Sequence, residues 1–141
     1  MALFQYGGTP VAGGDVTCTN TSIIDIPAGA GVVLDLAYPP SGDQAVAVTV
    51  PLASGSVAKP FGIATAIIKV GKSGPVRTLG SYPMTASGAI TYGDFVQIDG
   101  ATSHMGQAKT KGATVSQLGQ ALNTAADGEQ VLVRVVVAAN V

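Results

Sequence analysis

The sequence is poor in the residue types on which most enzymatic sites depend. It has a single cysteine, Cys18, a single histidine, His104, and no tryptophan among its 141 residues. A lone cysteine cannot form an intrachain disulfide, and a lone histidine leaves a catalytic dyad or a zinc site short of local partners. Because no spacing joins either residue to a third group, we expect no catalytic residue, no metal site and no cofactor.

Charge is also scarce. Lys, Arg, Asp and Glu make up 11% of the chain, against about 25% in an ordinary soluble domain, while 47% of the residues are hydrophobic. With seven basic and eight acidic residues, there is no basic excess to neutralise phosphates or an anionic membrane. We therefore expect neither a nucleic acid nor a membrane as partner.

The few charges are unevenly placed along the chain. Residues 1–58 hold four aspartates and no basic residue, net −4, whereas residues 59–141 hold seven basic and four acidic residues, net +3. Two interpretations are open. The asymmetry is an accident of small numbers in a monomer, or it suits head-to-tail contacts between copies in an assembly.

Targeting signals are missing from the N-terminus. The first basic residue is Lys59, and no apolar core of a signal peptide precedes it. No apolar stretch reaches the roughly 18 residues of a membrane span. These features predict a soluble protein made in a reducing cytoplasm.

Residues 1–22 are rich in Gly, Thr, Ser and Asn and show no clear periodicity, which predicts a flexible, extended N-terminal arm. In an extended conformation Phe4 and Tyr6 lie on one face. Together with Leu3 they are the candidate partner-binding residues, because a short apolar segment can add a strand to a partner or place rings in its grooves. The alternative is a frayed chain end.

Strand signals dominate the rest of the chain, residues 23–141, which we expect to form a single β-domain. Short β-branched runs alternate with turns that contain Gly or Pro. The expected strands are 31–36, 45–50, 61–68, 76–79, 95–98, 118–122 and 131–137. This spacing predicts an all-β fold with little helix, either a small antiparallel β-barrel or a β-sandwich.

The chain also resembles itself. Residues 61–80 align with residues 118–137 without a gap, so that Gly62 meets Gly119 and Arg77 meets Arg134. One interpretation is a strand–turn–strand unit used twice, and the other is coincidence in a chain rich in Gly, Ala and Val.

One segment, residues 66–73, fits a relaxed phosphate-binding loop with Ala66 in place of the first glycine. Its central residues are Ile, Ile, Lys and Val, which favour extended strand over a phosphate-wrapping loop. Gly74-Pro75 follows where a helix should begin. We therefore expect no nucleotide site.

Several short motifs of the C-terminal two thirds occur in a familiar order. They are Phe61-Gly62-Ile63-Ala64, residues 85–96 (TASGAITYGDFV), residues 118–122 (LGQAL) and residues 126–135 (ADGEQVLVRV). In this order, the chain resembles the small capsid cement, or head decoration, proteins of tailed bacteriophages over roughly residues 30–138.

The resemblance implies a compact β-domain that binds the outside of the expanded phage head and stabilises it. The implied partners are the major capsid protein and further copies of the chain, as homotrimers on the capsid. The implied location is the outer capsid surface of the virion, after synthesis in the bacterial host cytoplasm. No residue needs to perform chemistry, so the chain is expected not to be an enzyme.

Three other functions stay open. The first is a structural component of the phage tail, baseplate or fibre. The second is a carbohydrate-binding module, although such modules rely on exposed aromatic platforms and this chain has four Tyr, three Phe and no Trp. The third is a small hydrolase that uses His104.

Overall fold

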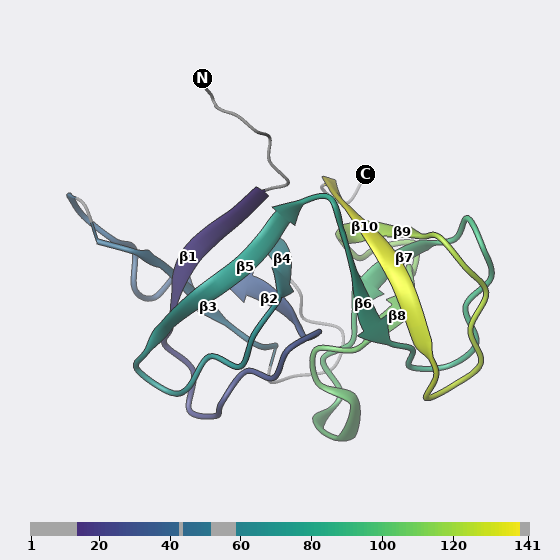
Figure 1. Cartoon of the computed structure of the whole chain (residues 1–141), viewed down its shortest axis with the longest axis horizontal. Helices are drawn as coiled ribbons and strands as arrows, with labels where there is room; N and C mark the ends of the chain where they lie inside the picture. The colour runs from purple at the N-terminus through teal and green to yellow at the C-terminus, as the bar shows by residue number, and fades with distance from the viewer. Residues whose placement is uncertain (1–13, 43, 52–58, 139–141) are drawn as a thin grey trace.

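Nearly all regular structure in the protein is β-strand (Figure 1). The computed structural model describes residues 14–42, 44–51 and 59–138. Within these ranges, the regular helical structure is one 3-10 turn, Thr102–His104. The predicted all-β fold with little helix is confirmed.

The first five strands form a closed barrel, seen on the left of Figure 1. They are β1 (Gly14–Asn20), β2 (Gly31–Leu34), β3 (Val46–Thr49), β4 (Pro60–Ala64) and β5 (Ser73–Leu79). Their order around the barrel is β1-β3-β2-β4-β5, and β5 closes the barrel against β1. The β1–β3 pair is parallel and the other pairs are antiparallel, so the barrel departs at one seam from the antiparallel arrangement that the sequence predicts.

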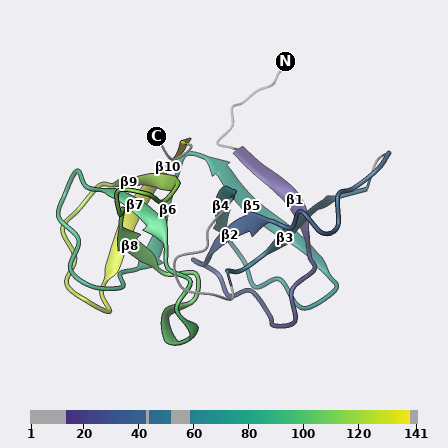
Figure 2. The same cartoon turned by 180° about the vertical axis from the view of Figure 1, so that it is seen from behind.

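The last five strands form a second sheet beside the barrel (Figures 1 and 2). They are β6 (Ser81–Thr85), β7 (Phe95–Ile98), β8 (Ala108–Thr110), β9 (Gln117–Ala121) and β10 (Gln130–Ala138). Their order is β6-β10-β9-β7-β8. A parallel bridge between Ala86 and Ala108 links the end of β6 to β8, so the two edges of this sheet also approach each other.

The prediction of an N-terminal arm over residues 1–22 is wrong for residues 14–20. Residues 14–20 of the expected arm are β1, which lies between β3 and β5 in the barrel, and both Cys18 and Asn20 are fully buried. The side-chain amide of Asn20 donates hydrogen bonds of 2.8 Å to the carbonyl oxygens of Ile24 and Ile68. A polar residue thus serves as a core residue because its donors are satisfied. The candidate residues Leu3, Phe4 and Tyr6 lie outside the described residues.

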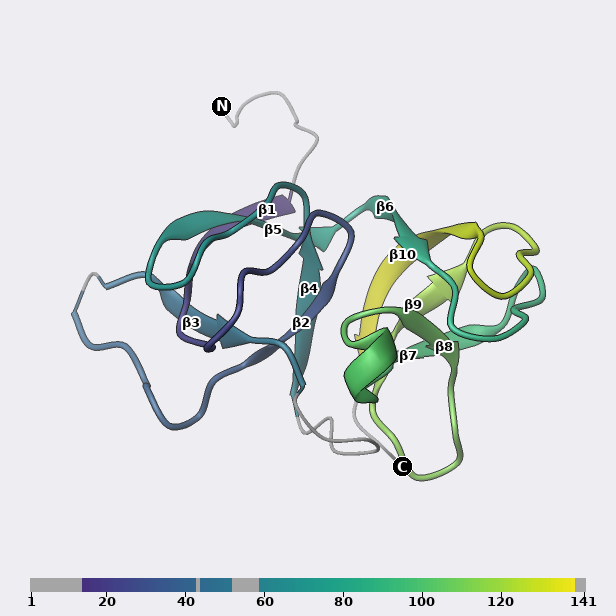
Figure 3. The same ribbon diagram turned by 90° about the horizontal axis from the view of Figure 1, so that it is seen from below.

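The barrel and the second sheet, which we call the two lobes, share part of their hydrophobic core. The barrel encloses one buried cluster around Val32, Val48 and Val76. The cluster of the second sheet includes two barrel residues, Val33 and Ile63. Figure 3 shows β2 and β4 on the side of the barrel that faces the second sheet, so the lobes are packed against each other as well as joined by the chain.

The internal repeat is confirmed by the strand register. Ala64 pairs with Val76 in the barrel, and Ala121 pairs with Val133 in the second sheet, at the same offset of 57 residues. The hairpin β4–β5 is therefore matched, residue by residue, by the hairpin β9–β10.

The equivalence extends to the first half of each lobe, which the sequence comparison does not detect. The glycine of each repeated hairpin faces the lobe's second strand in the same way, since Val32 pairs with Gly62 and Val96 with Gly119. The parallel seam recurs too: Asn20 pairs with Val48 in the barrel, and Ala86 bridges to Ala108 in the second sheet. The chain is thus a tandem pair of five-stranded units with one topology.

Candidate functional site

The chemically active side chains of the sequence lie apart. Cys18 is buried in the barrel, and burial raises the pKa of its thiol to about 11, so that the thiol is protonated at neutral pH. His104 lies exposed in the 3-10 turn of the other lobe, where its Nδ1 is 3.1 Å from the Ser103 hydroxyl. The two residues form no nucleophile–base pair.

The segment that fits a phosphate-binding loop is a strand connection. Residues 65–72 link β4 to β5, and Ile68 at their centre is buried and bridges to Ile26. The chain then enters β5 at Ser73, where a phosphate-binding loop would open a helix.

The described residues hold neither a cluster of metal ligands nor a membrane-spanning helix. In the part of the chain that the structure describes, no three His, Cys, Asp or Glu side chains gather as metal ligands. Across those same ranges, no helix has the length and apolar character needed to cross a bilayer.

One hydrogen-bonded polar pair recurs in both lobes. In the second sheet the Ser87 hydroxyl donates a 2.6 Å hydrogen bond to the Asp99 carboxylate, which also accepts one from the Ala101 amide at 2.9 Å. In the barrel the Thr21 hydroxyl donates to Asp35 at 2.5 Å. Each pair fastens the end of the lobe's second strand to the segment after its first strand, so its role is structural.

The Asp99 carboxyl stays charged despite its burial. Burial by itself raises its pKa, but the hydrogen bonds from Ser87 and Ala101 and the nearby Lys109 and His104 bring the pKa below its usual range. The group is engaged by the fold, so we assign it no role as an acid or base.

The junction between the lobes is held by Arg77. Its guanidinium pairs with the Asp15 carboxylate at 2.9 Å, donates to the Ser81 carbonyl oxygen at 3.0 Å, and lies 5.5 Å from the ring centre of Tyr82. The acidic first part of the sequence and the basic second part thus meet inside one chain, in the same barrel.

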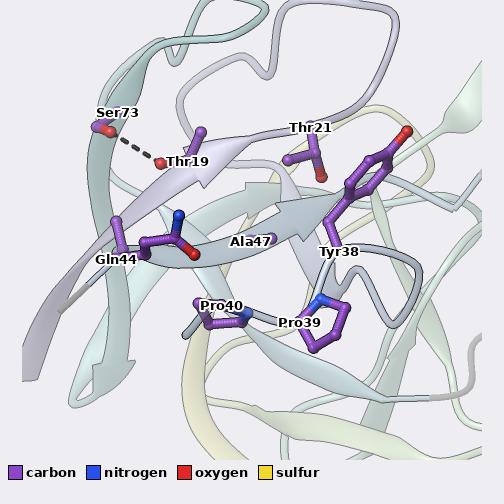
Figure 4. Close-up of a pocket in the computed structure, with 9 residues that line it drawn as sticks. Thr19, Thr21, Tyr38, Pro39, Pro40, Gln44, Ala47 and Ser73 are labelled. Atoms are coloured by element: carbon purple, nitrogen blue, oxygen red, sulfur yellow. Dashed lines mark hydrogen bonds between the residues drawn. The ribbon is translucent and has the colours of Figure 1, made fainter. Parts of the chain in front are cut away.

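A pocket of about 520 Å³ opens on the outer side of the barrel (Figure 4). Thr19 and Ser73, whose hydroxyls are 3.0 Å apart, stand at one side, and Tyr38 with Pro39 and Pro40 stands at the other. None of the described residues that line this pocket is charged. Its walls suit an uncharged occupant with an apolar or aromatic part.

The second sheet presents large apolar side chains to solvent. Tyr92 is 69% exposed and Phe95 is 48% exposed, and Leu122 and Leu132 are also exposed. Together with the barrel pocket, these residues are candidates for a binding surface. Sequence reasoning missed both surfaces, although the aromatic residue in each turn, Tyr38 and Tyr92, was a visible signal.

Comparison with known proteins agrees with this picture of a binding protein. The family model of the phage cement protein matches residues 11–137. None of the curated proteins compared with the chain matches it. Among solved structures, the fold is similar to the head fibre gp8.5 N base of bacteriophage phi29, with a TM-score of 0.58 and 19% sequence identity over 86% of this chain and 92% of that chain. Because the family model covers most of the sequence, the chain belongs to the phage cement protein family and is a virion-associated structural protein of a phage.

Proposed function

We propose that this protein decorates the outside of the expanded phage head and stabilises it against rupture. The observation that carries the proposal is the family match over residues 11–137. The weakly charged surface supports it, because interface cores are depleted in charged residues. The partner is the major capsid protein, and the chain reaches it after synthesis in the host cytoplasm.

The mechanism is linkage between binding and lattice stability. A protein that binds the expanded lattice but not the separated subunits stabilises the lattice by mass action. Many copies bound to one shell multiply this effect. Such a role needs complementary surfaces and no reacting group, in agreement with the scattered positions of Cys18 and His104.

Self-association is part of the proposal. Copies of the chain associate as homotrimers on the capsid, so that one assembly spans several capsid subunits. The contact between copies and the contact with the capsid are then separate surfaces, and each has its own test.

The first test is co-sedimentation of the purified protein with expanded and unexpanded heads of its own phage. Saturable binding to expanded heads, with a higher rupture temperature for the decorated particles, is the expected result. Binding to neither form overturns the proposal, and a glycan array and isolated tails then test a fibre or carbohydrate-binding role.

We further propose that Leu3, Phe4 and Tyr6 contribute to capsid or neighbour contacts. The test compares the full chain with a chain that lacks residues 1–13 and with the double variant Phe4→Ala, Tyr6→Ala. Loss of two aromatic anchors is expected to weaken head binding by roughly tenfold or more. Unchanged head binding in both shortened and substituted proteins would remove the arm from the interface.

A further inference from the structure

Inside the molecule, one turn of the barrel docks on the second sheet. This turn, residues 27–31, reads Pro-Ala-Gly-Ala-Gly, and it faces Thr85 and residues 105–107 across a small pocket of about 180 Å³. The amide of Gly31 donates a 2.8 Å hydrogen bond to the carbonyl oxygen of Gly106. The contact between the lobes therefore joins a turn on one unit to the β6 end and the β7–β8 connection of the other.

The second sheet carries the same turn at residues 91–95. In the barrel the amide of Gly29 donates to the carbonyl oxygen of Ala64 at 2.7 Å, and in the second sheet the amide of Gly93 donates to that of Ala121 at 2.9 Å. Both glycines have positive φ, 85° and 92°. The backbone of the two turns is thus equivalent.

The side chains of the two turns differ in size. The barrel turn has Ala28 and Gly31, and a side chain on Gly31 would collide with Ile98, since its Cβ would lie 2.7 Å from that residue. The equivalent positions in the second sheet are Tyr92 and Phe95, both solvent-exposed. In the barrel turn Ala30 and Gly31 are buried and Ala28 stays exposed beside the small pocket. The turn of the second sheet carries two exposed aromatic rings.

The barrel also carries a copy of the surface that receives this turn, and among the described residues this copy is an open pocket. The pairing of Asn20 with Val48 in the barrel matches the bridge between Ala86 and Ala108 in the second sheet. The residues one position earlier in the sequence therefore match as well, Thr19 with Thr85 and Ala47 with Gln107. Thr85 and Gln107 receive the turn inside the molecule. Thr19 and Ala47 line the 520 Å³ pocket (Figure 4), which is wider than its internal counterpart.

We propose that the Tyr92 turn of one copy inserts into the barrel pocket of a second copy, between Thr19 and the wall made by Tyr38 and Pro40. The contact would repeat, between molecules, the internal contact between the lobes. The wider pocket matches the larger turn, because a buried tyrosine contributes about 150–250 Å² of contact while its hydroxyl keeps a polar partner. This inference rests on the self-association part of the proposed function and names its surface.

The contact is heterologous, since the turn and the pocket lie on different lobes. Each new copy leaves one free turn and one free pocket until a ring closes. The described lining of the pocket is uncharged and the turn carries one charge, Asp94, so association is expected to depend only weakly on salt between low and physiological ionic strength.

Cysteine cross-linking tests this geometry in the full chain. Thr91→Cys, which neighbours Tyr92 in the exposed turn and keeps its ring, is mixed in equal amounts with Gln44→Cys, whose side chain lines the pocket, and the mixture is oxidised in concentrated solution and on decorated heads. The native Cys18 is buried and does not compete. The matched control replaces Thr91→Cys by Leu79→Cys, because Leu79 is also exposed, at 69%, and belongs to neither surface.

The expected result is a disulfide-linked dimer of unlike variants, several-fold more abundant than in the control mixture. Equal yields in both mixtures, in solution and on heads, overturn the inference while leaving head binding by the unmodified protein as the separate test of the proposed function.

A second variant, Tyr92→Asp, is expected to weaken self-association at least tenfold in sedimentation velocity, with an unchanged thermal midpoint. If it instead abolishes head binding and leaves self-association intact, the turn contacts the capsid, and the inference is wrong.

Discussion

Gly62 and Gly119 show how single residues set the backbone of each lobe. A Cβ on Gly62 would lie 2.2 Å from the carbonyl oxygen of Arg77, and a Cβ on Gly119 would lie 2.1 Å from that of Arg134. Neither distance permits a carbon atom. The two positions require glycine because the neighbouring strand approaches too closely for any side chain.

Gly62→Ala is therefore expected to lower the free energy of unfolding by at least about 2 kcal/mol, because the strand pair must separate to admit the methyl group. Gly119→Ala should have a similar effect. Gly112→Ala is the control, since its Cβ would meet no atom closer than 3.4 Å. The measurement is urea denaturation followed by circular dichroism, and equal midpoints for Gly62→Ala and Gly112→Ala would contradict the close approach.

The Asp99 carboxylate makes stability depend on pH at the acidic side. Its folded-state pKa lies below the ordinary value of 3.8. The charged group therefore stabilises the fold above about pH 4, and this contribution is lost as the pH falls through the folded-state pKa.

Ser87→Ala removes one hydrogen bond to this charged group and is expected to cost about 1.5–3 kcal/mol at pH 7. The difference from the unmodified protein should shrink at an acidic pH below the folded-state pKa, where the carboxyl is protonated in both folded and unfolded chains. Denaturation midpoints at both pH values check this. A difference of the same size at the two pH values would show that Ser87 acts through packing alone.

At the scale of elements, hydrophobic runs predict strands well, and polar strands escape detection. The runs 31–36, 45–50 and 95–98 correspond to β2, β3 and β7. The missed strands are β1, β6 and β8, which contain Thr, Ser, Pro or Lys and carry little apolar alternation. They form through pairing with distant strands, as β1 does with β5, and single-sequence periodicity cannot register such pairing.

The position of β1 gives a truncation test. Deleting residues 1–22 removes a strand that closes the barrel and exposes the apolar face of its neighbour, so we expect loss of cooperative unfolding. Deleting residues 1–13 keeps all ten described strands and should preserve it. Cooperative unfolding of the chain without residues 1–22 would show that β1 is dispensable.

The Cys18 thiol offers a second measure of the burial of β1, in the intact chain. Its reaction with a thiol reagent at pH 8 should be slow in the native protein and fast in urea, because burial keeps the thiol protonated.

At the scale of the whole molecule, the lobes are coupled by shared core residues. Ile63 belongs to the barrel by strand pairing but packs with the core of the second sheet, whereas Ile68 packs inside the barrel. We therefore expect the two lobes to unfold together, as one domain.

Ile63→Ala and Ile68→Ala test this coupling as a matched pair. Each is expected to cost roughly 2–5 kcal/mol, since each removes a fully buried side chain. Because the lobes are expected to unfold together, amide hydrogen exchange of the slowest amides should be faster in both lobes for each variant. Faster exchange confined to the barrel for Ile68→Ala would show that the lobes unfold separately.

The candidate surfaces could be predicted from sequence only in part. The family resemblance over roughly residues 30–138 was enough to indicate a structural capsid protein. The pocket was not predictable, because Thr19, Tyr38 and Ser73 come from three separate segments that meet only when the barrel closes. Nor was the significance of Tyr92, which depends on knowing that its counterpart, Ala28, faces the other lobe.

Because the two lobes share one topology, their sequences can be aligned with each other through the structure. Two unlike sequences follow one backbone, so a residue shared by both lobes, such as Ala64 and Ala121, reports what the backbone demands. A residue that differs, such as Gly31 and Phe95, reports what surrounds that position. Each lobe is therefore a reference state against which the other can be interpreted, and one polypeptide separates constraints of folding from constraints of assembly.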